Sequence, residues 1–91
     1  MSEVSLTNEF LQASMLIKNL SYLPNNDTLL FLYSYYKQAT IGDCNIPSPN
    51  FWNLKENAKY NAWKLLTGVS KENAMKLYIK KVKELCTQKE N

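Results

Sequence analysis

The stretch GDCNIPSPNFWN, residues 42–53, decides how the helices of this chain are arranged. Its twelve residues can extend over roughly 40 Å, whereas a helix of fifteen residues is only about 22 Å long. Pro47 and Pro49 favour extended backbone and discourage helix. The loop is therefore long enough to return along a whole helix, which predicts that the helices before and after it run parallel. An arrangement in which they run antiparallel stays open at this point.

The segment before this loop reads as a helix over residues 26–41. Asn26 or Asp27 can cap the free amides of its first turn, and Gly42 supplies a left-handed exit after Ile41. We therefore expect this helix to end at the loop.

The segment after the loop reads as a helix over residues 54–67. Asn53, with Glu56 three residues later, resembles a capping box, and Gly68 ends the pattern. The apolar positions expected to pack against the rest of the protein are Ala58, Ala62 and Leu65.

Two further helices are expected at the ends of the chain. Residues 8–20 carry one apolar stripe at spacings of three and four, and Pro24 prevents its continuation. Residues 70–88 follow Ser70, a good N-cap, and the last few residues are expected to fray. The apolar stripes of these two helices comprise Phe10, Ala13, Ile17 and Leu20 in the first, and Ala74, Leu77, Tyr78, Val82 and Leu85 in the second.

The connections on either side of the long loop are short. Residues 68–70 and 21–26 allow only tight turns between successive helices. With a long parallel connection in the middle, the prediction is an all-α, four-helix up-down-down-up bundle. At 91 residues the chain is expected to form a single domain over residues 1–91.

Composition narrows the class of protein. The chain is 45% hydrophobic and 21% charged, with a net charge of +3, which is typical of a water-soluble globule. No apolar run reaches the length of a membrane span, and the polar N-terminus does not resemble a signal peptide. We therefore expect a cytoplasmic protein without stable membrane insertion, and a monomer by default.

Residues that commonly carry catalysis or bind metals are scarce. The chain has no histidine, and Cys44 and Cys86 are far apart in the sequence, without metal-ligand or redox spacing. There is no glycine-rich phosphate loop, and the carboxylates are scattered. We expect no catalytic residue, no metal and no cofactor.

One face of the helix expected over 26–41 is unusually rich in tyrosine. Tyr33, Tyr36 and Lys37 share this face by the i, i+3, i+4 rule, whereas Leu32 and Ala39 share another. Tyrosines at such spacing are most often core residues with the hydroxyl group reaching water. Either these tyrosines pack into the core, or they line a groove, and the spacing does not decide between the two.

The next helix repeats the pattern with Lys55, Lys59 and Trp63 at steps of four. A parallel neighbour would bring Lys59 close to Lys37 and Tyr33, and lysines placed together favour a bound anion. The common alternatives are that such lysines are only solvated and that Trp63 is a core residue.

Three blocks of sequence resemble the acyl-CoA-binding protein family. They are YSYYKQATIGD at 33–43, LKENAKYNAW at 54–63 and SKENAMKLYIKKVKEL at 70–85, and they occur in the family's order and spacing. The resemblance covers about residues 8–86. It implies an up-down-down-up bundle that binds long-chain fatty acyl-CoA esters without catalysing a reaction on them.

The resemblance also implies roles for individual residues. Tyr33, Lys37 and Lys59 match residues that gather at the adenosine 3′-phosphate of coenzyme A. Tyr36 matches an aromatic beside the adenine, and Tyr78 one that contacts the ligand near its head. Further candidates are Lys18 and Lys55 for the head group, and Ser14, Leu29 and Leu30 for the wall of a surface groove that holds the acyl chain.

The chain departs from the common family pattern at two places. Tyr60 replaces a usual tryptophan, and Phe51 and Trp52 stand in the loop where glycine usually follows the proline. The two loop aromatics either influence the preferred chain length or only hold the loop in place.

Two other functions compete with an acyl-CoA carrier. Lysines interleaved with tyrosines also suit a small helical nucleic-acid-binding domain, although the absence of arginine and the low net charge argue against nucleic acid as a partner. An exposed face with Tyr33 and Tyr36 also suits a protein-interaction module. For a carrier, acyl-CoA-using enzymes are the candidate receivers of the ligand.

Overall fold

The computed structural model describes residues 3–88, which form an all-α structure, as expected from the sequence. No strand is present in this range. The elements are α1 (Glu3–Leu16), extended by the 3₁₀ turn η1 (Ile17–Asn19), then α2 (Asn26–Thr40), α3 (Leu54–Lys64) and α4 (Lys71–Gln88).

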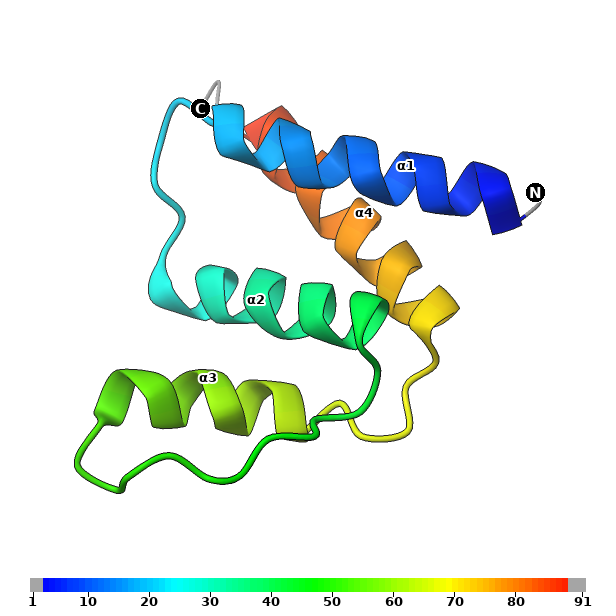
Figure 1. Ribbon diagram of the computed structural model, residues 1–91. Coiled ribbons are helices and arrows are strands. Elements are labelled where there is room, and N and C mark those ends of the chain that lie inside the picture. The colour runs from blue at the N-terminus through cyan, green and yellow to red at the C-terminus, as the bar shows by residue number, and fades with distance from the viewer. Residues whose placement is uncertain (1–2, 89–91) are drawn as a thin grey trace.

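The helices have the predicted up-down-down-up arrangement. The helices α2 and α3 lie side by side and run in the same direction, whereas α1 and α4 run in the opposite one (Figure 1). The loop over residues 42–53 passes back along α3, so that α2 and α3 begin at the same end of the molecule (Figure 1). This rules out the antiparallel alternative for these two helices.

The core lies where α4 packs against α1 and α2. Trp63 on α3 is also buried, with 1% of its surface exposed, and its indole N–H donates a hydrogen bond of 2.8 Å to the carbonyl oxygen of Gly42. Of the alternatives for Trp63, the interpretation as a core residue is confirmed. The other buried apolar residues form one cluster of Leu6, Phe10, Ala13, Leu32, Ala39, Ala74, Tyr78, Ile79, Val82 and Leu85.

The first helix begins earlier and ends earlier than predicted. It starts at Glu3 rather than Asn8, because Leu6 lies four residues before Phe10 and extends the buried stripe by one turn. Its last predicted residues instead form the tighter turn η1, and Leu20 then has extended backbone.

The cap of α2 is Asn25, so the prediction of Asn26 or Asp27 as the cap was wrong. Asn25 has extended backbone, and its side chain accepts a hydrogen bond of 2.8 Å from the Thr28 amide. Asn26 and Asp27 are already helical and cannot take this role. The left-handed exit at Gly42 is confirmed, with a φ angle of 101°.

At the start of α3 the Asn53 cap is confirmed, since its side chain accepts from the Glu56 amide. The helix ends at Lys64 rather than Thr67, because the next turn tightens to bonds between residues three apart. Leu65 is 84% exposed, so its prediction as a packing residue was wrong. It lies just past the last helical residue, where the chain is already turning.

The predicted cap of α4 is confirmed by a bond of 3.1 Å from the Asn73 amide to the Ser70 hydroxyl oxygen. Leu77 was predicted in the buried stripe but is 40% exposed, and Ile79 is buried instead. The reason is that α4 packs against both α1 and α2, which shifts its buried arc. The expected fraying concerns residues 89–91, which lie outside the described residues.

A polar bracket of Gln38, Asp43, Gly68 and Val69 joins the turn after α2 to the turn after α3. The carboxylate of Asp43 accepts one hydrogen bond from the Gly68 amide and one from the Gln38 side chain, each 2.9 Å long. The Gln38 amide also donates to the carbonyl oxygen of Val69. The Gly68 bond, followed by the Gln38 bond, lowers the pKa of Asp43, and these outweigh a smaller opposing effect of burial.

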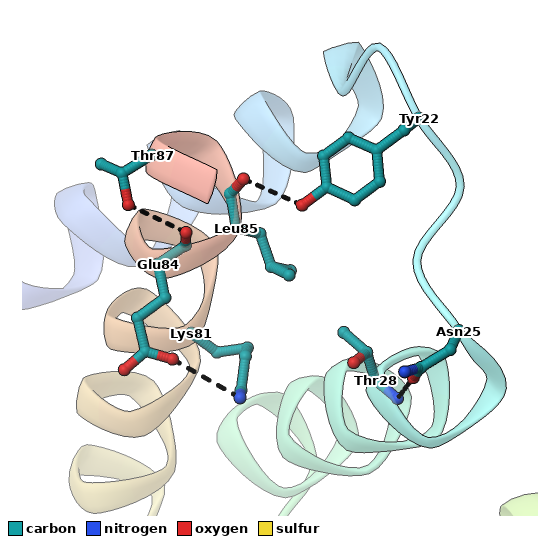
Figure 2. A network of polar contacts seen from close by, with 7 residues as sticks. All are labelled: Tyr22, Asn25, Thr28, Lys81, Glu84, Leu85 and Thr87. Atoms are coloured by element: carbon teal, nitrogen blue, oxygen red, sulfur yellow. Dashed lines mark hydrogen bonds and ion pairs between the residues drawn. The ribbon is translucent and has the colours of Figure 1, made fainter. Parts of the chain in front are cut away.

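A second long-range bond ties the connection between α1 and α2 to the end of α4. The Tyr22 hydroxyl donates to the carbonyl oxygen of Leu85 over 2.9 Å, as Figure 2 shows. The bond joins residues 63 positions apart in the sequence and so fixes this connection against α4.

Among the described helices, none is long and apolar enough to cross a membrane. Cys44 and Cys86 are free thiols, both partly buried.

Candidate functional site

Two adjoining surface depressions share Tyr33. The first, here called the groove, has a volume of about 520 Å³ and lies between the first halves of α2 and α3. The second, here called the slot, has a volume of about 430 Å³ and lies between α1, α2 and α4. The groove is lined by Asn26, Leu29, Leu30, Tyr33, Lys55, Ala58 and Lys59. The slot is lined by Ser14, Lys18, Leu32, Tyr33, Tyr36, Lys37 and Tyr78.

The groove combines an apolar wall with two cations. Leu29, Leu30 and Ala58 supply apolar surface from two parallel helices, and Lys55 and Lys59 follow one another on α3 at a spacing of four. The parallel direction of α2 and α3 is what places the first turns of both helices beside the same depression. Such a trough can hold an extended apolar chain whose polar end reaches a lysine.

Lys59 is oriented toward Tyr33 across the two helices. Its ammonium nitrogen lies 5.1 Å from the centre of the Tyr33 ring, within the range of a cation–π contact. The same nitrogen lies 3.5 Å from a carboxylate oxygen of Glu56, one turn earlier on α3. The lysine is therefore held at the boundary of the two depressions by groups on both helices.

The slot is walled by aromatic rings. The ring of Tyr36 stacks on that of Phe10 with centroids 5.5 Å apart, and lies 6.0 Å from that of Tyr78. Phe10 and Tyr78 also contact each other edge to face. Because Tyr36 keeps 40% of its surface exposed, it presents a fixed aromatic surface to solvent.

Tyr78 lies deeper, with only 3% of its surface exposed. Burial raises the pKa of its phenol, and the neighbouring Tyr36 adds to this effect. Tyr78 therefore stays protonated in neutral solution and can act as a hydrogen-bond donor at the floor of the slot.

Lys37 is positioned by a contact to the structural tryptophan. Its ammonium nitrogen lies 5.3 Å from the centre of the Trp63 ring, and Trp63 is fixed by its bond to Gly42. The turn after α2 thus helps to position a lysine of the slot.

The structure decides which face of α2 packs into the core. Leu32 and Ala39 are buried at 7% and 1% exposure. Tyr33 and Lys37 are only partly buried and line the two depressions together with Tyr36. Of the two alternatives that the sequence left open for this face, the structure therefore supports the second: the tyrosines line surface depressions.

All ten residues singled out from the sequence line one depression or the other. Ser14, however, lies in the slot with the tyrosines and not beside Leu29 and Leu30. Lys55 lies in the groove with these leucines rather than in the slot. Lys59 lines the groove and Lys37 lines the slot, and Tyr33 lines both depressions.

Three lining residues had no assigned ligand role from the sequence. The sequence predicts Asn26 only as a helix cap, Ala58 only as a packing residue, and Leu32 only as part of the opposite face of α2, whereas all three line a depression. The parallel pairing of α2 and α3 was the signal that could have found Asn26 and Ala58. Both lie in the first halves of these helices.

The chemistry of this site is that of binding. Cations, aromatic rings and an apolar trough suit a ligand with an anionic, aromatic head and a long apolar tail. Among the described residues, no group of three or more histidine, cysteine, aspartate or glutamate side chains is placed to hold a metal ion.

Comparisons with known proteins point to one family. Residues 7–82 match the family model described as "Acyl CoA binding protein". The chain is 45% identical over 82 residues to an acyl-CoA-binding protein of Gossypium hirsutum, covering 90% of this chain and 92% of the relative.

Solved structures of relatives have the same fold. The crystal structure of Oryza sativa Acyl-CoA-Binding Protein 2 has a TM-score of 0.87 at 42% identity, covering 91% of this chain and 92% of that one. The crystal structure of ACBP from Moniliophthora perniciosa also has a TM-score of 0.87, at 34% identity, covering 100% and 86%. The resemblance seen in the tyrosine and lysine blocks is thus confirmed over most of the chain, and the protein belongs to the acyl-CoA-binding protein family.

Proposed function

We propose that this protein binds medium- and long-chain fatty acyl-CoA esters, with the head group in the slot and the acyl chain in the groove. The observation that carries the proposal is that Tyr33 lines both depressions. A ligand with a charged aromatic head and an apolar tail can therefore occupy both at once.

The head group would be held by aromatic and charge-assisted contacts. Tyr36 offers a fixed ring to the adenine, and stacking of a base contributes about 1 to 3 kcal/mol. Each hydrogen bond to a charged phosphate contributes about 1.5 to 3 kcal/mol. The donors we assign to the head group, with Tyr36, are Tyr33, Lys37, Tyr78 and Lys18 from the slot. Lys59 and Lys55 are assigned to it from the groove, where the two depressions meet the head group's phosphates.

The position of Lys59 favours the 3′-phosphate near the boundary of the two depressions. Its ammonium group already lies against Tyr33 and Glu56, so an arriving phosphate would displace one glutamate oxygen and keep the lysine in place. Lys37, which lines the slot together with Tyr33, is assigned to the same phosphate.

The acyl chain would lie along Leu29 and Leu30. Each methylene removed from water contributes up to about 0.8 kcal/mol, so affinity rises steeply with chain length. Ser14 lines the slot, and we therefore assign it to the end of the acyl chain nearest the head group.

We infer that the protein acts as a carrier that buffers and transports its ligand rather than transforming it. The lining residues supply lysines, tyrosines and apolar groups, and no histidine exists in the chain to act as a general base. We place this carrier in the cytoplasm as a monomer, with acyl-CoA-using enzymes as receivers.

The competing functions receive less support from the geometry. A nucleic-acid strand needs a continuous basic track, whereas Lys18, Lys37, Lys55 and Lys59 line two short depressions that share one tyrosine. A protein partner would not require an apolar trough next to a tyrosine and lysine slot.

Isothermal titration calorimetry tests the proposal directly. Palmitoyl-CoA, kept below its micelle concentration, is titrated into the protein alongside free CoA and palmitate. Tight one-to-one binding of the ester, with much weaker binding of either half alone, is the expected result. Failure of the ester to bind correctly folded protein would overturn the proposal, and RNA would be the next ligand to titrate.

A further inference from the structure

Three large apolar side chains protrude together from the end of the molecule where α2 and α3 begin. Phe51, Trp52 and Leu54, here called the tip, expose 82%, 68% and 79% of their surfaces. The rings of Phe51 and Trp52 contact each other edge to face, with centroids 5.1 Å apart. None of the three lines the groove or the slot, so the proposed ligand site does not account for their exposure.

The tip lies in a stretch without charge. Residues 44–54 include no charged side chain, and Lys55, which follows directly, is exposed and makes no ion pair with a described residue. Asp27 and Glu56 lie in the first turns of α2 and α3, and Glu56 is paired with Lys59. The tip itself therefore carries no charge that an apolar phase would have to remove from water.

Several backbone groups in and beside the tip are already hydrogen-bonded. The Asn57 side-chain amide donates to the carbonyl oxygens of Asn50 and Asn53, over 2.7 and 2.9 Å. The Asn53 amide bonds to Asn50, and the Leu54 amide to Trp52. Unpaired backbone groups are costly in lipid, and these four bonds reduce that cost while holding the aromatic side chains outward.

We propose that the tip is a membrane-docking surface that inserts reversibly into the interfacial layer of a phospholipid bilayer. Tryptophan favours the boundary between headgroups and acyl chains, and Lys55 is placed to meet a lipid phosphate. A protein partner would have to supply a pocket for a convex cluster, whereas a bilayer receives such a cluster without a preformed cavity.

Because the tip lies beside the groove, docking to a membrane would serve the uptake of ligand. The groove is lined by Asn26 and Lys55, among the first residues of α2 and α3, so it begins beside the tip. A docked protein would present the groove to the bilayer, where amphiphiles with long acyl chains accumulate. This use rests on the proposed function, whereas the docking itself does not.

The experiment uses the full chain and large unilamellar vesicles that contain no acyl-CoA. The vesicles are made of phosphatidylcholine, with or without phosphatidylserine, and binding is followed by flotation. Trp52 and Trp63 are the two tryptophans of the chain, and only Trp52 is exposed. Docking predicts a blue shift of Trp52 emission and its quenching by lipids brominated near the headgroup.

The double variant Phe51→Ser with Trp52→Ser is expected to lower the vesicle partition coefficient by about tenfold or more. The matched control is Leu65→Ser, which removes an equally exposed leucine just past the other end of α3 and should leave partitioning unchanged. Asn57→Ala, which frees the loop carbonyls, should give an intermediate loss. Circular dichroism melting curves confirm that each variant is folded.

Several outcomes would overturn the proposal. These are absence of vesicle binding by the unaltered protein, equal binding by the double variant, or an equal loss in Leu65→Ser. Concentration-dependent self-association in sedimentation that the double variant abolishes, without vesicle binding, would instead assign the tip to a second copy of the chain. Calorimetry with palmitoyl-CoA in solution keeps the two proposals apart, because the double variant should bind it normally.

Discussion

The ammonium nitrogen of Lys59 lies 5.1 Å from the centre of the Tyr33 ring, although the two residues are on different helices separated by residues 41–53. This contact joins the groove to the slot. It also makes the pair the most direct place to test the proposed ligand site.

Tyr33→Phe and Lys59→Ala are each expected to weaken palmitoyl-CoA binding by roughly tenfold or more, since each removes a hydrogen bond to a charged group worth about 1.5 to 3 kcal/mol. Thermal stability should change little, because both residues are only partly buried. Calorimetry and thermal melting check the two expectations. A large drop in melting temperature would place these residues among those that hold the fold.

Lys64 and Tyr60 provide a matched control for this experiment. They form a similar contact, with the ammonium nitrogen 5.9 Å from the ring centre, but line neither depression. Tyr60→Phe and Lys64→Ala should therefore leave affinity unchanged. Equal losses in both pairs would indicate a general effect of charge or of α3 stability.

Leu29→Ser should lower affinity in proportion to the length of the acyl chain. Long-chain esters bury methylenes against this wall and should lose about 1 kcal/mol, whereas a butyryl ester should lose almost nothing. Titration of an acyl series with the variant checks this. A loss of the same size at every chain length would place Leu29 at the head group.

The Asp43 carboxylate makes stability depend on pH in acid. Its bonds to Gly68 and Gln38 lower its pKa below the ordinary value of 3.8. The stabilisation is therefore present above pH 3.8 and is lost as the pH falls through the folded-state pKa. Asp43→Asn should be less stable than the unaltered protein at neutral pH in urea unfolding. That difference should shrink in strong acid, and a constant difference would contradict the expectation.

Tyr78 should have the opposite effect in alkali. Burial raises its pKa above the ordinary value of 10.0, so the stabilisation is complete below that value and is lost as the pH rises through the folded-state pKa. Tyr78→Phe cannot ionise and should lose less stability between neutral and strongly alkaline solution. Parallel alkaline slopes in urea unfolding would show that ionisation of Tyr78 is not coupled to unfolding.

Tyr22→Phe should lower the free energy of unfolding by about 1 kcal/mol, the contribution of one hydrogen bond. The bond to the Leu85 carbonyl lies away from both depressions, so acyl-CoA affinity should stay the same. Urea unfolding and calorimetry measure these two quantities. A loss of affinity without a loss of stability would be the opposite of this expectation.

The topology could be predicted from the sequence because it follows from chain geometry. The loop over residues 42–53 is longer than the helix beside it, and Pro47 and Pro49 keep it extended. The buried face of each helix is harder to predict from the sequence. Leu65 and Leu77 fit an apolar helical stripe by their spacing, but both are exposed. Which arc of a helix is buried depends on how many neighbours it has, and spacing within one helix does not contain that information.

The candidate site, too, could be predicted only in part from the sequence. Residue types and spacing identified the lysines and tyrosines, and the resemblance assigned them to a ligand. The division into groove and slot, with Ser14 in one and Lys55 in the other, required the relative placement of α1 and α3. Leu32 and Ala39, the face of α2 that is buried in place of Tyr33, pack in one cluster with residues of α4, which lies far along the chain.

Because α4 packs against both α1 and α2, the protein can complete its fold only at the end of synthesis. A ribosome delivers α1, α2 and α3 before α4, yet Leu32 and Ala39 of α2 belong to a buried cluster that includes residues of α4. Tyr22 and Leu85 bond across 63 positions of the chain. Neither contact can form before α4 has been synthesised. The nascent chain should therefore acquire a competent ligand site only when its last helix has emerged, and a product truncated before Lys71 should not accumulate as a partly active carrier.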